Sequence, residues 1–284
     1  MKAVLPPTKC GKTEFRWGEK TYVMGIVNLS PDSFSGDGIG VDLKRTVEQA
    51  QRMVAEGADI IDVGGESTRP GTEAMSIDDV EDELRLVIPA ITRLVKEISV
   101  PISIDSYKNR VAKEALDAGA SIINDIWGLK RDPSLAQLAA ERGVPIILMA
   151  NERDAPPRTG IVAKVMADLE SGIKMSLKAG VPPENIIVDP GCGFGKTLEQ
   201  NLELVNRLGE LKKLGKPILL GTSRKSMIGL ILDRPADQRL EGNLAVTAIG
   251  IANGADIVRV HDVQETALVC RMSDAIIRRG FIGE

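Results

Sequence analysis

The chain has 284 residues, of which 43% are hydrophobic and 27% are charged, a balance typical of one globular domain in water. Its net charge of −4 argues against a broad nucleic-acid surface, and no apolar run suits a transmembrane helix or a signal peptide, so we expect no nucleic-acid and no membrane partner. Cys10, Cys192 and Cys270 lie far apart beside a single histidine, which argues against a zinc site and favours reduced thiols in a cytoplasmic protein.

The first 21 residues precede all regular strand–helix units and are predicted to form an N-terminal extension to a single domain spanning 22–284. Within the extension, residues 15–22 fit a β-hairpin with Gly18 and Glu19 at its turn. We expect this hairpin to close one end of the domain that follows.

Eight short runs rich in isoleucine and valine come next, and each has the length and composition of a buried parallel strand. The predicted strands cover residues 22–28, 59–64, 101–105, 120–125, 144–149, 185–189, 217–221 and 257–262. Between the strands, apolar residues recur at helical spacing, as Leu43, Val47, Ala50 and Val54 do. The predicted helices cover residues 42–56, 76–98, 109–118, 134–142, 161–179, 199–214, 241–253 and 264–279.

This regular alternation of eight strands and eight helices predicts an α/β fold, a (β/α)8 TIM barrel. An open, doubly wound sheet is the alternative, and the number and regularity of the units disfavour it. In a barrel, the polar residues that end different strands meet at one rim, which is where active sites of this fold lie. The residues at the strand ends therefore predict the function.

Asp105, Asn124 and Asp189 end the third, fourth and sixth predicted strands. A single Asp at such a position is commonly a helix cap or a turn residue, and that structural role is the alternative for each. Three such groups at one barrel mouth would instead hold a flat, donor-rich heterocycle, because carboxylates form charge-assisted hydrogen bonds with ring and exocyclic N–H groups. The pattern is typical of sites for guanine-like rings.

Two long polar loops follow the first and second strands at residues 28–38 and 64–71, and loops on adjacent strands indicate lids over a site. The segment 189–197 looks like a nucleotide motif but fits neither kind. Pro190 stands where a P-loop has glycine, and Lys196 stands where the dinucleotide fingerprint has glycine. We interpret it as a Gly-rich loop that lets the backbone approach a ligand, with Phe194 as a lid or stacking surface.

Two adjacent cations, Arg224 and Lys225, follow the seventh strand and precede a predicted helical turn. Cations, hydroxyls and helix N–H groups favour an anion site, and a solvated basic turn is the alternative. Arg259 and His261 alternate on the eighth strand and should project to the same side. No nucleophile elbow is present for His261 to serve as a base, so phosphate binding beside Arg259 and opposite Asn28 is the better interpretation.

Two long motifs carry a resemblance to a known family. Met24-Gly-Ile-Val-Asn28-Leu-Ser-Pro-Asp32-Ser-Phe34-Ser closely resembles the first signature of the dihydropteroate synthases, which are pterin-binding barrels, and Asp62-Val-Gly-Gly-Glu-Ser-Thr-Arg-Pro-Gly71 resembles the second. Segments at 103–105, 123–125, 189–196, 223–226 and 259–262 resemble the remaining blocks in the same order. The resemblance extends from about residue 22 to the C-terminus.

The resemblance implies a homodimeric enzyme that joins 6-hydroxymethyl-7,8-dihydropterin diphosphate to 4-aminobenzoate, releasing pyrophosphate and 7,8-dihydropteroate with Mg²⁺ as cofactor. By position, it assigns the pterin to Asp105, Asn124, Asp189 and Lys225. It assigns the diphosphate to Asn28, Thr68, Arg69, Arg259 and His261, with Asn28 also ligating Mg²⁺. It assigns the 4-aminobenzoate pocket to Phe34, Pro70, Phe194 and Ser226. Its catalytic residues would be Asp32, Lys225, Arg259 and His261, with Asp32 stabilising positive charge on the pterin methylene.

The implied chemistry suits the composition of the chain. Pyrophosphate leaves readily once cations neutralise its growing charge, and the pterin ring can delocalise the methylene cation, so an SN1-like path is expected. An aromatic amine is already neutral at pH 7 and needs no strong general base, which explains how one histidine suffices. We expect the aminobenzoate pocket to form only after the first two loops close, which gives ordered binding.

The chain departs from the family pattern at Ala150, because histidine usually follows the equivalent of Met149. Two other functions stay open. A methyltetrahydrofolate-dependent methyltransferase shares the pterin barrel but would need neither residues 67–70 nor residues 223–225. A catalytically silent pterin-binding paralogue would have no use for leaving-group chemistry, yet Asn28, Asp32 and Arg259 are present.

Overall fold

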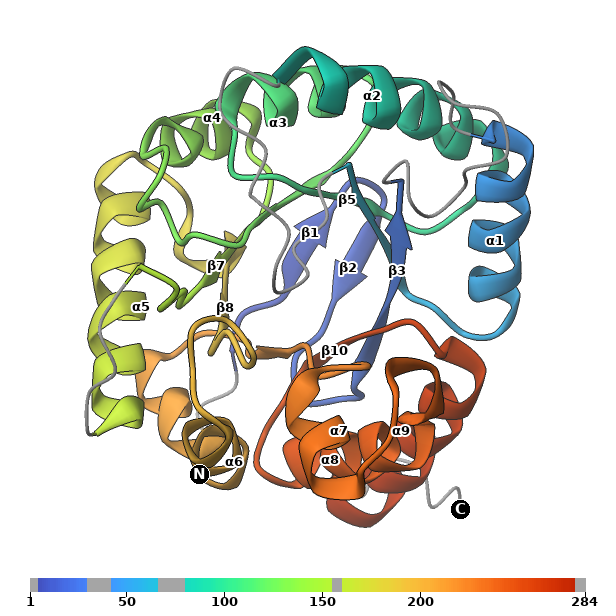
Figure 1. Cartoon of the computed structure of the whole chain (residues 1–284). Coiled ribbons are helices and arrows are strands. Elements are labelled where there is room, and N and C mark those ends of the chain that lie inside the picture. Colours follow the sequence, from blue (N-terminus) through green and yellow to red (C-terminus); the bar gives the residue numbers. More distant parts are fainter. Residues whose placement is uncertain (1–4, 30–41, 66–79, 155–159, 279–284) are drawn as a thin grey trace, which may run out of the picture.

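The computed structural model describes residues 5–29, 42–65, 80–154 and 160–278. Within these ranges, parallel strands alternate with helices around a central axis (Figure 1), which confirms the TIM barrel. The barrel strands are β3 (Tyr22–Asn28), β4 (Ile60–Gly64), β5 (Ile102–Asp105), β6 (Ile122–Asp125), β7 (Ile146–Met149), β8 (Ile186–Asp189), β9 (Leu219–Leu220) and β10 (Ile257–Val260). They are ordered β8-β7-β6-β5-β4-β3-β10-β9, and a bridge between Val188 and Ile218 joins the two end strands. The alternative of an open sheet is therefore wrong.

Helices form the outer ring in Figure 1, and most follow the predicted ranges closely. They are α1 (Leu43–Ala55), α2 (Val80–Glu97), α3 (Asn109–Asp117), α4 (Ser134–Arg142), α5 (Ile161–Lys178), α6 (Leu198–Asn206), α7 (Ser226–Leu232), α8 (Leu240–Ala252) and α9 (Val263–Ile277). Short 3-10 helices lie at Pro183–Asn185, Leu208–Leu214 and Ala236–Gln238. Residues 76–79, predicted to begin the second helix, lie outside the described residues. No helix of the described residues is both long and apolar enough to cross a membrane.

The predicted helix 199–214 is wrong in one respect, because it breaks after Asn206. The side-chain amide of Asn253, which follows α8, donates to the carbonyls of Val205 (2.9 Å) and Asn206 (3.1 Å). A helix end leaves such carbonyls without intrahelical partners, and here a distant residue satisfies them. The chain continues as the 3-10 helix at Leu208–Leu214.

Alternate residues of the strands face two different cores, as the two-residue period of a strand requires. One set points outward and packs under the helices, for example Val63, Ile104 and Val188. The other set fills the lower barrel interior, and this interior cluster comprises Cys10, Phe15, Trp17, Tyr22, Met24, Ile60, Ile122, Ile147, Ile187, Leu219 and Ile257. The barrel is thus solid at this end and carries no channel.

The N-terminal extension closes the barrel as expected, but its hairpin lies earlier than predicted. Strand β1 (Thr8–Cys10) pairs antiparallel with β2 (Thr13–Phe15) through a turn at residues 11–12. The chain also turns at Gly18 and Glu19 as predicted, but only an isolated bridge between Trp17 and Lys20 flanks this second turn. The aromatic rings explain the difference, because Phe15 packs edge-on to Tyr22 at 4.8 Å between ring centroids and Trp17 does so at 5.5 Å. The residues expected to pair as a hairpin instead plug the barrel interior.

Candidate active site

A layer of polar side chains lies directly above the apolar interior cluster. It contains Asp62 on β4, Asn124 on β6, Asp189 on β8 and Arg259 on β10. Each stands two residues after an isoleucine of the interior cluster, so its side chain enters the same barrel interior. Asp105 ends β5 in the same layer and contacts Arg259. The structure thus brings Asp105, Asn124, Asp189 and Arg259 together at one end of the barrel, as predicted, and adds Asp62 to them.

Arg259 holds two of the carboxylates together. Its Nε donates to Asp62 Oδ2 and its Nη2 donates to Asp105 Oδ2, both at 2.6 Å. Asn124 Nδ2 also donates to Asp62 Oδ2, at 3.1 Å. Burial opposes the charge of Arg259, yet the two carboxylates outweigh it and raise the pKa of the guanidinium above its ordinary value. The arginine is therefore permanently charged in the barrel mouth.

Asp62 is the site residue that the strand-end argument missed. It is fully buried within β4, and its Oδ1 has no hydrogen-bond partner among the described residues. The sequence could have identified it, because Asp62 is a carboxylate inside a predicted strand, two residues after the apolar Ile60 and therefore on the same side of the strand. Because burying an unpaired carboxylate is costly, such a position indicates a paired or ligand-binding group.

Asp189 and Lys225 form a second charged pair of groups at the mouth. Burial raises the pKa of the Asp189 carboxyl, and the nearby Lys225 opposes that rise without cancelling it. Desolvation likewise lowers the pKa of Lys225 despite the attraction of Asp189. A ligand that donates hydrogen bonds to Asp189 would favour its charged form, so this carboxylate is suited to an N–H-rich ring.

The loop after β8 lies beside this pair. The main-chain N–H of Gly191 donates to Asp189 Oδ1 at 2.7 Å, and Lys225 Nζ donates to the carbonyl of Cys192 at 2.5 Å. Burial raises the pKa of the Cys192 thiol to about 11, so this cysteine is not an activated nucleophile at neutral pH. The loop thus brings backbone close to the ligand-binding layer, as its glycines predicted.

Phe194 in this loop has two cationic side chains close to its aromatic ring. Lys225 Nζ and Arg153 Cζ each lie 4.6 Å from its ring centroid. It joins an apolar cluster with Tyr107, Ile126, Trp127 and Met149 above the barrel. Ser226, assigned to the same pocket, is exposed at the start of α7. The other two predicted pocket residues, Phe34 and Pro70, lie outside the described residues.

His261 follows β10 and is held by Ser223, a contact that the sequence did not predict. Ser223 Oγ lies 2.9 Å from His261 Nδ1 and accepts from the His261 main-chain N–H at 3.2 Å. The Ser223 hydroxyl thus contacts both the ring and the main chain of His261. The histidine is oriented, as a binding residue requires.

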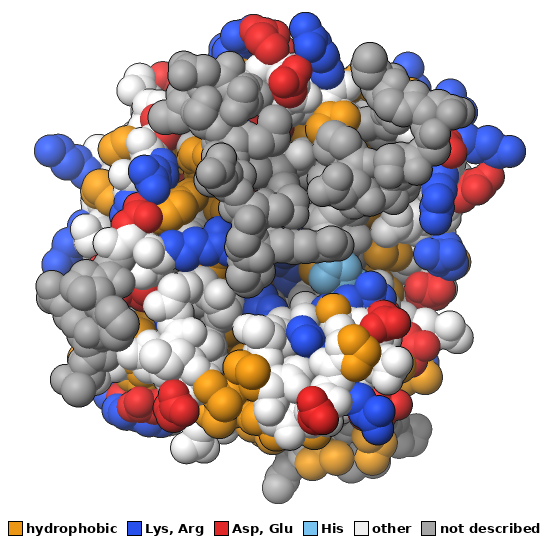
Figure 2. Space-filling model, viewed as in Figure 1, with side chains coloured by type: hydrophobic (Ala, Val, Ile, Leu, Met, Phe, Trp, Pro, Cys, Tyr) orange, Lys and Arg blue, Asp and Glu red, His pale blue; other side chains and the backbone are white. Residues whose placement is uncertain are grey.

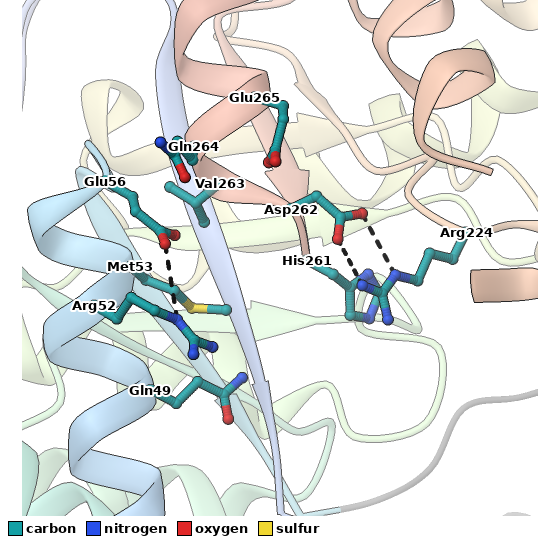
Figure 3. Close-up of a pocket in the computed structure, with 10 residues that line it drawn as sticks. All are labelled: Gln49, Arg52, Met53, Glu56, Arg224, His261, Asp262, Val263, Gln264 and Glu265. Atoms are coloured by element: carbon teal, nitrogen blue, oxygen red, sulfur yellow. Dashed lines mark hydrogen bonds and ion pairs between the residues drawn. The ribbon is translucent and has the colours of Figure 1, made fainter. Parts of the chain in front are cut away.

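The two adjacent cations after β9 do not share one site. Lys225 faces the β8 loop, whereas Arg224 Nη2 pairs with Asp262 Oδ1 at 2.6 Å on the other side of the mouth. Figure 3 shows this pair beside His261 at a cavity of about 390 Å³ between α1 and the start of α9. In Figure 2, Lys and Arg side chains and the histidine gather near the centre of the same face. This cavity adjoins His261, and neither Asp105 nor Asp189 lines it.

Asn28 is the residue to which a metal ion was assigned. It ends β3, is half-buried, and lies in register with Gly64 of β4. Among the described residues, no group of three or more histidine, cysteine or acidic side chains could hold a metal ion by itself. An amide oxygen fits Mg²⁺, which is commonly held by one or two protein ligands together with water and phosphate oxygens. Asp32, Thr68 and Arg69 lie outside the described residues.

Ala150 follows β7 and is fully buried. Its N–H donates to the carbonyl of Asp189 at 3.0 Å, and its carbonyl accepts from Lys196 Nζ at 2.7 Å. The side-chain amide of the next residue, Asn151, is buried and donates to the carbonyl of Ile126 at 2.9 Å. Residue 150 thus acts through its main chain.

Together these observations define a TIM-barrel protein whose mouth presents acids and fixed cations to a flat, donor-rich ligand. Residues 24–261 match the model of the family described as pterin binding enzyme, and the chain belongs to this family. A dihydropteroate synthase of Clostridium beijerinckii is 51% identical over 272 residues, which covers 95% of this chain and 100% of the relative.

Solved structures agree with the sequence comparison. Dihydropteroate synthase from Clostridium difficile in the presence of pteroic acid superposes with a TM-score of 0.89 at 48% identity, covering 93% of this chain and 99% of that one. The enzyme from Xanthomonas albilineans in complex with 7,8-dihydropteroate gives a TM-score of 0.86 at 36% identity, covering 95% and 98%. The expected fold and family are both confirmed.

Proposed function

We infer that this protein is an enzyme that condenses 6-hydroxymethyl-7,8-dihydropterin diphosphate with 4-aminobenzoate, giving 7,8-dihydropteroate and pyrophosphate. One observation carries the inference most directly. Asp105, Asn124, Asp189 and Arg259 come from four separate strands and meet in one buried layer of the barrel mouth. Relatives that cover nearly the whole chain bear the name of this enzyme.

The pterin ring is rich in N–H donors, and the site is rich in acceptors that face inward. Asp189 accepts ring and exocyclic N–H groups, while Lys225 lies beside it and supplies the opposing charge. Asn124 contributes an amide that is already oriented by Asp62. Because these groups are buried and preorganised, binding needs little rearrangement of the β-strand ends.

Arg259 has to change partners when the pterin binds. In this structure its guanidinium donates a hydrogen bond to the Asp105 carboxylate, which the pterin also needs as an acceptor. We propose that the ring N–H groups replace the guanidinium on Asp105, while Asp62 retains Arg259 Nε. The released end of the guanidinium then binds the diphosphate together with His261. Recognition of the ring is thereby coupled to activation of the leaving group.

Mg²⁺, when bound through Asn28, would neutralise charge on the departing pyrophosphate. Arg259 and His261 supply fixed hydrogen-bond donors at the same place, so their contribution needs no reorganisation during bond breaking. The carbon–oxygen bond to the diphosphate breaks first, the amine of 4-aminobenzoate then attacks the pterin methylene, and the new bond forms as the amine loses a proton to solvent. This SN1-like order fits a site in which carboxylates lie near the ring and stabilise positive charge on it.

The proposal is tested with purified protein, both substrates and Mg²⁺. We expect pyrophosphate and 7,8-dihydropteroate to form in equal amounts, as measured by a coupled phosphate assay and by chromatography. Reactions that lack 4-aminobenzoate or contain the Asp189→Ala variant are the controls. If the pterin diphosphate binds by calorimetry but neither product forms under any condition, the protein is a silent pterin-binding paralogue. Methyl transfer from methyltetrahydrofolate would instead favour the methyltransferase.

A homodimer is also part of the proposal. Helices α8 and α9 lie side by side and expose Ile249 (51%), Leu268 (59%) and Met272 (63%). The neighbouring Ile251, by contrast, is buried in the core. Contiguous apolar side chains on an outer face are typical of subunit interfaces, and a second copy of the chain is the partner that we propose. The three cysteines are unpaired and buried, which supports a cytoplasmic location.

A further inference from the structure

Lys196 has an ammonium group that three main-chain carbonyls engage, although no substrate contact was assigned to it. Its Nζ donates to the carbonyls of Ala150 (2.7 Å), Gly191 (2.8 Å) and Phe194 (3.3 Å). An ammonium has three N–H donors, so all three can be satisfied by main-chain carbonyls. Two of these carbonyls lie at the ends of the segment 191–194, and the third follows β7.

The β8 loop lies directly on the segment that follows β7. A Cβ atom at Gly191 would come within 2.1 Å of the Ala150 carbonyl oxygen, and one at Gly195 would come within 2.3 Å of the Glu152 carbonyl carbon. Both glycines also have positive φ angles, +68° and +70°. The main-chain N–H of Glu152 donates to the Phe194 carbonyl at 3.2 Å. Lys196 thus joins two backbone segments that only glycine allows to approach so closely.

The segment that Lys196 holds carries three features of the proposed site. The Gly191 N–H binds Asp189, the Cys192 carbonyl accepts Lys225, and the Phe194 ring lies between two cations. We propose that Lys196 is a positioning residue that sets the orientation of the Phe194 ring for 4-aminobenzoate. This inference rests on the proposed function. It adds a residue that touches neither substrate and acts through the loop backbone.

The ionisation of Lys196 gives this role a pH signature. Desolvation lowers the pKa of its ammonium to about 8. The charged and titratable groups that face it are Cys192 and Asp189 from β8 and its loop, Glu152 from the β7 loop, and Lys225 from the β9 loop. The charged form has three donors for three carbonyls, and the neutral amine has two. Above about pH 8 the loop should therefore lose one of its three ties.

The test compares Lys196→Met and Lys196→Arg with the exposed control Lys213→Met. We expect Lys196→Met to raise the KM for 4-aminobenzoate about tenfold or more, since a shift of about 1 Å in a positioned group is enough for such a loss. Affinity for the pterin diphosphate, measured by calorimetry without 4-aminobenzoate, should change by less than about threefold, because the β-strand ends stay in place. Lys213→Met should behave as wild type in both measurements.

The pH profile separates positioning from general stability. The wild-type kcat/KM for 4-aminobenzoate should fall as pH rises through about 8, and Lys196→Arg, which stays charged, should abolish that fall. The wild-type profile needs no variant, so it tests the idea even if Lys196→Met does not fold. The proposal would be overturned if Lys196→Met kept the wild-type KM for 4-aminobenzoate. It would also be overturned if kcat/KM of the wild-type protein did not change with pH, or if kcat/KM of Lys196→Arg fell above about pH 8 as it does in the wild type. Failure of the wild-type protein to form dihydropteroate would instead overturn the proposed function.

Discussion

Replacing Arg259 by alanine separates the two tasks that we assign to this residue. In this structure its guanidinium lies between Asp62 and Asp105, with two contacts of 2.6 Å. The variant removes a donor for the diphosphate and also removes the side chain that pairs with the Asp105 carboxylate. We therefore expect opposite effects on turnover and on binding of a pterin that lacks the diphosphate.

The sizes of these effects follow from the contacts. Loss of one preorganised donor to developing charge costs about 10²–10³-fold in turnover. Asp62 and Asp105 are 0% and 9% exposed, and removal of one partner from a buried ion pair costs about 3–5 kcal/mol of folding free energy. Binding of a bare pterin should be unchanged or tighter, because its N–H groups no longer compete with the guanidinium for Asp105.

The assay combines pyrophosphate release, calorimetry with the bare pterin, and thermal unfolding to confirm a folded variant. Arg259→Lys retains the positive charge but not the second donor group, so it should recover part of the stability and little of the turnover. Arg224→Ala is the matched control, since Arg224 is an exposed arginine of the neighbouring loop that pairs with Asp262. Wild-type turnover in Arg259→Ala would refute the diphosphate role. A loss of bare-pterin affinity as large as the loss of turnover would refute the partner exchange.

Three further changes test separate parts of the structure. Asp189→Ala should weaken pterin binding by about 2–5 kcal/mol by calorimetry, because buried N–H donors of the ligand lose their partner; unchanged affinity would place the ring elsewhere. Ala150→His should leave kcat near wild type but lower the free energy of unfolding by about 1–3 kcal/mol, because position 150 is fully buried; a large gain in kcat would contradict its main-chain role. Ile249→Glu should shift the protein to monomer in light scattering, and an unchanged mass would remove this face from the interface.

Much of the fold follows from local patterns in the sequence. Runs such as Ile186–Asp189 are short, β-branched and buried on both faces, which is the composition of strands in a parallel sheet covered on both sides. The break after Asn206 could not be predicted in this way, because it depends on Asn253, almost fifty residues later in the chain. The turn at Gly18 and Glu19 was predictable, but the strand pairing expected around it was not formed, since Trp17 and Tyr22 pack into the barrel interior.

In the candidate site, too, the positions of residues at strand ends could be predicted from the sequence, and the contacts between distant side chains could not. Asp105, Asn124 and Asp189 were predictable, because the end of a parallel strand fixes both their depth and their side of the barrel. The contacts that orient them were not predictable, since the approach of Arg259 to Asp62 depends on side-chain direction across the barrel. Lys196 was visible in the sequence only as a misfit to nucleotide motifs, and the role that we propose for it rests on the carbonyls that it binds.

The missing histidine at position 150 is explained by the same backbone contacts. Ala150 takes part in the site through its N–H, which binds the Asp189 carbonyl, and through its carbonyl, which binds Lys196. Neither contact depends on the side chain, so a change from histidine to alanine leaves both in place. Arg259 and His261, the donors that we propose for the leaving group, lie on β10 and in the loop that follows it. The substitution therefore falls on a residue that contacts the β8 loop through its main chain and not on one of these proposed donors.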